Sequence, residues 1–273
     1  MPETKAELYI GTVGWTYKDW SGTFYPHDLD QKDFLLYYSE VFNALEIDST
    51  FYGIPRPEVV ASWYAKVPET FRFAAKLPRA ITHERGLVDV DEILTPFLSS
   101  IALLGSRLGC LLVQLPPGLH RNEITVNRVA AFLSLLPTSD FRFAIEFRHP
   151  SWIHTETFEL LRKHNVAWTI QDHSTLMPIV IELTADFTYI RWMGDDEDPR
   201  ISSVREVVVD RTEDIIRWAN ALKKTIMPSV NTVFGFFNNH YAGHSPANCN
   251  QLKRLMAMAV VEPDTGQRQM NLF

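Results

Sequence analysis

The stretch that decides the fold is GCLLVQL at residues 109–115, which is apolar at every position except Gln114. A strand that is apolar throughout is typical of a parallel sheet with helices on both faces. The next stretch, NRVAAFLSLL at residues 127–136, has the spacing of an amphipathic helix, and FRFAIEF at residues 141–147 is again strand-like. Together they predict a strand–helix–strand unit with parallel strands.

The same alternation continues over the whole chain. Strand-like runs occupy residues 8–12, 44–48, 71–76, 109–115, 141–147, 166–171, 187–192 and 232–237. Helical spacing occurs at residues 34–42, 57–67, 91–105, 127–136, 157–164, 212–225 and 246–261. The stretch LMPIVIEL at residues 176–183 fits either a short helix or an extra strand.

Eight such units in 273 residues predict an α/β protein that forms a single (β/α)8 TIM-like barrel over residues 1–262. A doubly wound open sheet is the alternative. It is less favoured because no GxGxxG or Walker-type glycine loop follows any of the strands.

The composition indicates an ordinary globular protein, with 46% hydrophobic and 22% charged residues. The net charge of -7 argues against indiscriminate binding of nucleic acid or acidic membranes. No apolar run is long enough to cross a bilayer, and charges near the start replace the apolar region of a signal peptide. We therefore expect a cytoplasmic protein without a membrane partner, in which Cys110 and Cys249 are buried thiols.

Polar residues finish most of the predicted strands, and in a barrel these ends meet at the face that carries function. The residues in question are Glu46, Asp48, Lys76, Gln114, Glu146, Arg148, Gln171, Asp172, Arg191, Asn238 and Asn239. Burying a charge is costly unless the charge is paired. The cluster is therefore either a plug of mutually neutralising charges or a shared site, and convergence from several strands favours the site.

The residue types suggest how such a site would work. Lys76, Arg148 and Arg191 would attract a phosphate or carboxylate, and Glu46 with Glu146 would supply the acid and the base. The predicted catalytic residues are Glu46, Glu146, Asp172 and Lys76. The predicted substrate-binding residues are Arg148, Arg191, Gln114, Asn238, Asn239, Trp15, Tyr52 and His83. The amides would orient a substrate or stabilise an oxyanion, and the loop aromatics would line the pocket or pack as a lid.

Seven stretches resemble one family of proteins. They are GTVGWTYKDWSGTFYP (11–26), FNALEIDSTFYGIP (42–55), FAAKLPRAITH (73–83), QLPP (114–117), EFRHPSW (146–152), YIRWMG (189–194) and FFNNHYAGHSPANC (236–249). In this order and over nearly the whole chain they resemble the YecE-like family, domain-of-unknown-function family 72. The resemblance implies a TIM-like barrel and no established reaction. The family usually has Arg, an apolar residue, His and Gly after the seventh strand, whereas Met193 replaces the histidine here, so that histidine's role is not carried over.

These features predict a hydrolase that acts on an anionic, phosphate-containing substrate. A phosphodiester is favoured, and a nucleic-acid phosphodiesterase or nuclease linked to DNA maintenance is one form that this activity could take. The alternatives are a binding module without turnover, a Schiff-base lyase acting through Lys76 and a glycosidase with two carboxylates. No cofactor is predicted. A divalent metal could be held by His83, His149, His173 or His240 with Asp48, Glu146 and Asp172, but no HxH or HExxH spacing occurs and nearby cations would compete for the carboxylates.

Residues 263–273 are predicted to form a flexible tail, because the polar stretch EPDTGQRQ (262–269) separates the last residues from the final helix. Its last five residues, QMNLF, resemble the peptide by which many bacterial DNA-processing proteins bind the sliding clamp. The predicted partner-binding residues are Gln269, Met270, Leu272 and Phe273. The alternative is a tail that packs on its own barrel. With a phosphodiester pocket, a clamp-binding peptide would point to DNA maintenance.

Overall fold

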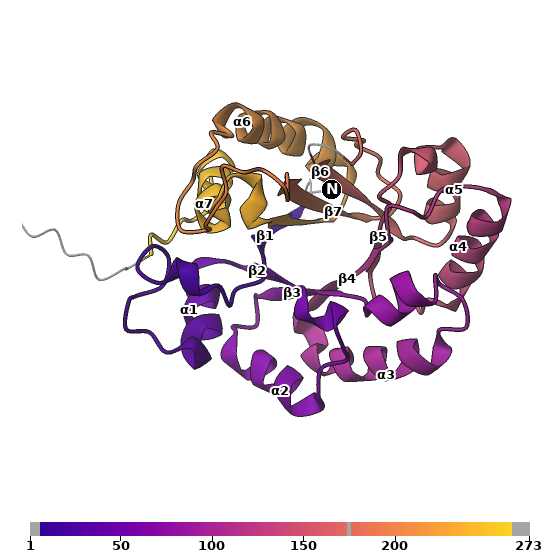
Figure 1. Cartoon of the computed structure of the whole chain (residues 1–273), viewed down its shortest axis with the longest axis horizontal. Coiled ribbons are helices and arrows are strands. Elements are labelled where there is room, and N and C mark those ends of the chain that lie inside the picture. Colours follow the sequence, from indigo (N-terminus) through magenta and orange to yellow (C-terminus); the bar gives the residue numbers. More distant parts are fainter. Residues whose placement is uncertain (1–5, 174–175, 264–273) are drawn as a thin grey trace, which may run out of the picture.

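A closed barrel of eight parallel strands forms the centre of the protein. The computed structural model describes residues 6–173 and 176–263. Each strand pairs with the next one in the sequence, and β8 pairs with β1, which closes the barrel. Figure 1 shows the strands at the centre and the helices around them. The predicted (β/α)8 TIM-like barrel is confirmed, and the open-sheet alternative is excluded.

The element bounds lie close to the predicted ones. The strands are β1 (Glu7–Val13), β2 (Ala44–Ile47), β3 (Arg72–Lys76), β4 (Leu108–Gln114), β5 (Phe143–Glu146), β6 (Ala167–His173), β7 (Phe187–Gly194) and β8 (Thr232–Phe237). The α-helices are α1 (Phe34–Val41), α2 (Pro57–Lys66), α3 (Asp91–Ile101), α4 (Glu123–Leu135), α5 (Thr155–Lys163), α6 (Thr212–Ala221) and α7 (Ser245–Leu255). None of the described helices is long and apolar enough to span a bilayer.

Residues 176–183 form neither of the two predicted elements, so both alternatives for this stretch are wrong. Pro178 lacks the backbone N–H that a helix or a central strand requires. The chain instead runs along the barrel, where Thr184 accepts a hydrogen bond from the Trp168 backbone at 2.7 Å and donates one to the Val166 carbonyl at 2.7 Å. Met177 of this stretch belongs to the hydrophobic core, and Leu176, Val180 and Leu183 pack against it.

Alternating side chains of the strands fill two separate regions of the core. In β4, Cys110 and Leu112 belong to the cluster inside the barrel, whereas Leu111 and Val113 pack in the cluster between the strands and the helices. This is the two-residue period of a strand with both faces buried. Cys110 and Cys249 are both buried and free, as predicted.

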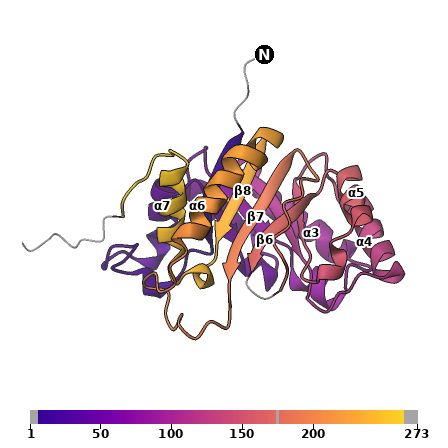
Figure 2. The ribbon, with the colours of Figure 1, turned by 90° about the horizontal axis from the view of Figure 1, so that it is seen from above.

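A close backbone approach joins the ends of β7 and β8, which Figure 2 shows side by side and next to α6 and α7. Gly194 has φ +73°, and a Cβ there would lie 2.1 Å from the His240 carbonyl oxygen. Only glycine fits such a position without strain. The loop after β8 is therefore held against the end of β7, at the face where the polar strand ends meet.

Candidate functional site

Arg191 is the centre of a buried group of charges at the carboxyl end of the barrel. Its Nε and Nη2 donate to Glu46 Oε2 and Oε1 at 3.0 and 2.8 Å, and its Nη1 donates to Glu146 Oε2 at 2.7 Å. Nη1 also lies 3.3 Å from Gln114 Oε1. The guanidinium is 1% exposed, and the side chains of Glu46 and Glu146 are fully buried. We call Glu46, Gln114, Glu146 and Arg191 the charge network.

Strand register brings these residues together. Gln114 and Glu146 are neighbours across β4 and β5. Each of them, like Glu46 on β2, comes two positions after a residue that faces the inside of the barrel, so all three side chains face inward. Tyr189, two residues before Arg191 on β7, also faces inward and donates to Glu46 Oε2 at 2.8 Å. The last inward-facing layer of the barrel is therefore polar, and Arg191 and Tyr189 donate to its carboxylates.

The two buried glutamates differ in their proton affinity. Burial and the nearby Asp48 carboxylate raise the pKa of Glu46, and the charge of Arg191 only partly offsets this rise. Burial also acts to raise the pKa of Glu146, but the charges of Arg191 and Arg148 outweigh it and bring that pKa down to about 2. The second cation accounts for the difference, since Arg148 Nε lies 2.6 Å from Glu146 Oε1.

A second group of residues lies around the charge network and is partly accessible. Lys76 Nζ donates to Asp48 Oδ1 at 3.0 Å and lies 3.9 Å from the ring centre of Phe51. Lys76 is 7% exposed, whereas the side chains of Asp48 and Arg148 are 37% and 15% exposed. Burial lowers the pKa of Lys76, and the Asp48 carboxylate opposes that effect.

His83 completes this accessible group. It lies in the turn Ala80–Glu84 after β3, where its Nδ1 is 2.8 Å from Thr82 Oγ1. Burial lowers the pKa of His83, and the positive charges of Lys76, Arg79 and Arg148 lower it further. His83 is therefore a neutral imidazole at neutral pH, and its ring centre lies 5.0 Å from that of Phe51, the ring that Lys76 contacts. We call Asp48, Lys76, His83 and Arg148 the barrel mouth.

The three predicted cations do not form an open positive pocket. Arg191 is sealed between two glutamates, Arg148 pairs with Glu146, and Lys76 pairs with Asp48. Both readings of the strand-end cluster therefore apply to different parts of it. The charge network resembles the neutralised plug, while Lys76 and Arg148 keep some surface with which to meet a ligand.

Three predicted site residues lie away from this cluster. Asp172 points toward the helix layer, where its Oδ2 accepts from Trp218 Nε1 on α6 at 2.7 Å and from the Tyr241 hydroxyl at 3.3 Å. Successive side chains of a strand point to opposite faces, and the position before Asp172 faces the inside of the barrel, so Asp172 faces the helices. Trp15 packs edge to face on Trp63 of α2, with ring centres 6.0 Å apart. Tyr52 is 80% exposed and contacts the ring of Phe51 at the edge of the barrel mouth.

Asn238 and Asn239 support the loop between β8 and α7. Asn238 Oδ1 accepts from the His240 backbone at 2.9 Å. Asn239 Oδ1 accepts from the backbone N–H and the hydroxyl of Ser245, at 3.1 and 2.8 Å, at the start of α7. The oxygen atoms of both amides are thus occupied in local structure.

Sequence reasoning did not select Tyr17, which lies beside the charge network. Its hydroxyl donates to the Val13 carbonyl at 2.9 Å. Burial raises the pKa of Tyr17 to about 12, and the negative charges of Asp48 and Glu46 add to the effect. Nothing in the aromatic stretch around Tyr17 separates it from its neighbours. Tyr189 was also missed, although its position two residues before Arg191 was a usable signal.

The predicted metal ligands do not gather at one point. No group of three or more His, Cys, Asp or Glu side chains arranged to hold a metal occurs in residues 6–173 and 176–263. His149 stacks on His120 with ring centres 3.7 Å apart, and His173 Nε2 lies 3.9 Å from Asp196 Oδ2.

Comparisons with known proteins agree with the fold. The family model described as "Protein of unknown function DUF72" matches residues 9–270. The chain is 26% identical to the UPF0759 protein YunF of Bacillus subtilis over 296 aligned positions, which cover 97% of this chain and 100% of that protein. It is 32% identical to the UPF0759 protein YecE of Escherichia coli K12 over 145 residues, which span 53% of this chain and only 50% of that relative.

Solved structures give the same result. A DUF72 family protein from Thermotoga maritima has a TM-score of 0.79 and 28% identity, covering 92% of this chain and 99% of that one. A DUF72 family protein from Enterococcus faecalis has a TM-score of 0.76 and 22% identity, covering 96% and 99%, and this second likeness concerns the fold alone. None of these names states a reaction.

Proposed function

Since this chain belongs to the DUF72 family of proteins of unknown function, we propose its activity from the site: it is a hydrolase that acts on an anionic, phosphate-containing substrate at the barrel mouth. The observation that carries the proposal is the convergence of Lys76, Arg148 and neutral His83 above a sealed charge network. Active sites of TIM barrels lie at this end of the strands. Perturbed pKa values in one cluster are a further sign of a functional site.

Each group at the barrel mouth has a role in this reaction. The Lys76 ammonium and the Arg148 guanidinium donate to phosphate oxygens and stabilise the charge that grows during attack. His83 accepts a proton from water as the water oxygen bonds to phosphorus and the P–O bond to the leaving alcohol breaks. The lowered pKa of Lys76 makes its ammonium a better proton donor to the leaving oxygen than an exposed lysine would be.

The charge network supports the barrel mouth from below. Arg148 is oriented by Glu146, which Arg191 in turn fixes in place. A network whose hydrogen bonds are made within the protein requires little reorganisation when a substrate binds. Glu46 and Glu146, predicted as acid and base, are too deeply buried to meet a substrate directly. In the proposal they position the accessible cations.

The geometry weighs against the glycosidase alternative. Two carboxylates that cleave a glycosidic bond must face the bond from either side. Here the guanidinium of Arg191 fills the space between Glu46 and Glu146. Burial lowers the pKa of Lys76 despite the Asp48 carboxylate at 3.0 Å, so the Schiff-base lyase, which requires a neutral lysine, remains the second candidate for this site.

Turnover of phosphate esters tests the proposal and separates it from a binding module. Purified protein is incubated with a panel of phosphate monoesters and diesters, and product release is measured for the wild type, Lys76→Met and His83→Gln. We expect turnover by the wild type and a loss of about 100-fold or more in kcat/KM for each variant. The control is Lys224→Met, which changes an exposed lysine after α6. If the wild type and the variants all bind a phosphate ester and none of them converts it, the alternative of a binding module without turnover is supported instead.

The link to DNA maintenance rests on the peptide QMNLF. Its residues Gln269, Met270, Leu272 and Phe273 lie outside the described residues. We propose that this peptide docks on a sliding clamp, which would deliver an acidic protein to nucleic acid that it binds weakly alone. A phosphodiester of nucleic acid is then the substrate of choice.

A further inference from the structure

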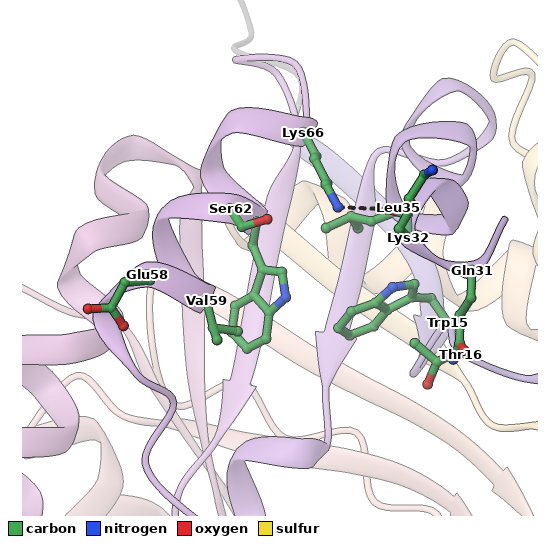
Figure 3. A pocket seen from close by; sticks show the side chains of 10 residues that line it. Trp15, Thr16, Gln31, Lys32, Leu35, Glu58, Val59, Ser62 and Lys66 are labelled. Carbon is green, nitrogen blue, oxygen red and sulfur yellow. Dashed lines mark hydrogen bonds between the residues drawn. The ribbon is translucent and has the colours of Figure 1, made fainter.

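A groove between α1 and α2 lies outside the barrel and takes no part in the proposed reaction. Its volume is about 320 Å³, at the small end of the range for ligand pockets. We define the groove by Trp15, Leu35, Glu58, Val59, Trp63 and Lys66, which are the lining residues that matter here. Figure 3 shows Trp15 facing α2 across the groove, with Glu58 and Lys66 far apart on that helix.

The groove has opposite charges at its two ends. On α2, residues 58, 59, 62, 63 and 66 follow helical spacing and form one face, and all five line the groove. Glu58 and Lys66 are eight residues apart, which is about 12 Å along a helix axis. Within the described part of the chain, neither residue belongs to an ion pair. Lys66 Nζ makes one hydrogen bond, to the Lys32 carbonyl at 2.6 Å, which leaves two of its protons for a ligand.

The middle of the groove is aromatic. Trp15 and Trp63 meet edge to face at 88°, with ring centres 6.0 Å apart. Both side chains are only partly buried, so each keeps surface on which a flat ring can stack. Indole faces stack on nucleobases with little regard to base identity, and a carboxylate accepts hydrogen bonds from an exocyclic amino group.

We propose that the groove binds a nucleotide whose base carries an amino group. The base stacks on the indole of Trp63, its amino group donates to Glu58, and its phosphate pairs with Lys66. An elongated ligand with a donor at one end, a flat ring in the middle and an anion at the other matches this order of residues. An aliphatic or uncharged ligand would leave Glu58 and Lys66 unused.

The inference does not rest on the proposed hydrolase activity. The groove and the barrel mouth have no residue in common. They are joined through the chain, since Trp15 lines the groove while Tyr17, two residues later, lies beside the charge network. Failure of one proposal therefore leaves the other to be judged separately.

Calorimetric titration of the full chain with adenosine monophosphate tests the inference. We expect binding by the wild type, and Trp63→Leu weakens it about tenfold or more because a stacking surface is lost. Glu58 is exposed, so Glu58→Gln should leave the fold intact. Glu58→Gln should reduce the ratio of the affinity for adenosine monophosphate to that for uridine monophosphate by about fivefold or more.

Two controls make the result decisive. Glu92→Gln changes an exposed glutamate at the start of α3, and Lys224→Met changes an exposed lysine after α6. Both should bind adenosine monophosphate as the wild type does. The inference is overturned if the wild type does not bind, or if Trp63→Leu and Glu58→Gln both bind adenosine monophosphate as the wild type does.

Discussion

Replacing Arg191 by methionine removes the one cation that lies between two buried carboxylates. The change keeps much of the side-chain volume and leaves Glu46, Glu146 and Gln114 without their shared donor. Arg191 is 1% exposed, so water cannot readily take its place. We expect a large loss of stability that depends on pH.

The magnitude follows from the contacts. Three hydrogen bonds from Arg191 end on carboxylate oxygens. At about 1.5–3 kcal/mol for each bond to a charged group, their sum would be about 5–9 kcal/mol. Proton uptake by the abandoned glutamates limits the loss, and removal of one partner from a buried ion pair costs about 3–5 kcal/mol. We therefore expect a decrease of about 4 kcal/mol in the free energy of unfolding at neutral pH.

The loss of Arg191 changes the way in which stability depends on pH. In the wild type the folded pKa of Glu146, about 2, lies below its ordinary value of 4.5. Its contribution to stability is present above pH 4.5 and is lost as the pH falls toward about 2. In Arg191→Met the folded pKa of Glu46, which is already raised in the wild type, rises further, and that of Glu146 rises as well because only Arg148 remains beside it. The penalty is then absent below the unfolded pKa and grows as the pH rises through the folded pKa. The difference between the proteins should shrink as the pH falls.

Urea unfolding followed by circular dichroism measures this difference at neutral pH and at about pH 4.5. Arg217→Met, which changes an exposed arginine on α6, is the control and should unfold like the wild type. The reasoning is refuted if Arg191→Met loses less than about 1 kcal/mol at neutral pH, or if its deficit is the same at both pH values.

Three further predictions follow from single features. If His83 is the base, kcat/KM for a phosphate ester should stay constant down to below pH 6.5, because burial and the neighbouring cations lower the pKa of His83. His83→Gln should remove the decrease in kcat/KM at acidic pH, and the same decrease in the variant would exclude this role. A chain without residues 269–273 should lose sliding-clamp binding in a pull-down that retains the full chain, whereas equal capture of both would contradict docking through the peptide. Gly194→Ala should lower the free energy of unfolding by about 2 kcal/mol or more, because the new Cβ would meet the His240 carbonyl oxygen at a positive φ; a melting temperature equal to that of the wild type would contradict the close approach.

Much of the fold could be predicted from the sequence because the strands are apolar and regularly spaced. Each predicted strand overlaps an observed one, as FRFAIEF does with β5 at Phe143–Glu146. The ends were harder to predict, since they depend on local hydrogen bonds. α4 begins at Glu123, four residues before the predicted start, because Asn122 and Thr125 form a capping box. α7 ends at Leu255 rather than at residue 261, and Ala257 just beyond it has a positive φ.

The members of the charge network could also be predicted, because polar residues at the ends of apolar strands are conspicuous. Their partners could not. Glu46 and Arg191 are 145 residues apart in the sequence, and only the barrel register determines that they meet. Asp172 was assigned to the site although strand alternation places it on the other face from Gln171. The burial of Arg191 between two glutamates, which closes the expected three-cation pocket, follows from side-chain packing that no sequence pattern records.

The measurement that most directly tests phosphate recognition at the barrel mouth is calorimetric titration with orthophosphate. The wild type should bind, and Arg148→Gln should bind about tenfold or more weakly because a charge-assisted hydrogen bond is lost. Lys224→Met, at an exposed position, should bind as the wild type does. Absence of binding by the wild type, or equal affinity in Arg148→Gln, would contradict the proposed site.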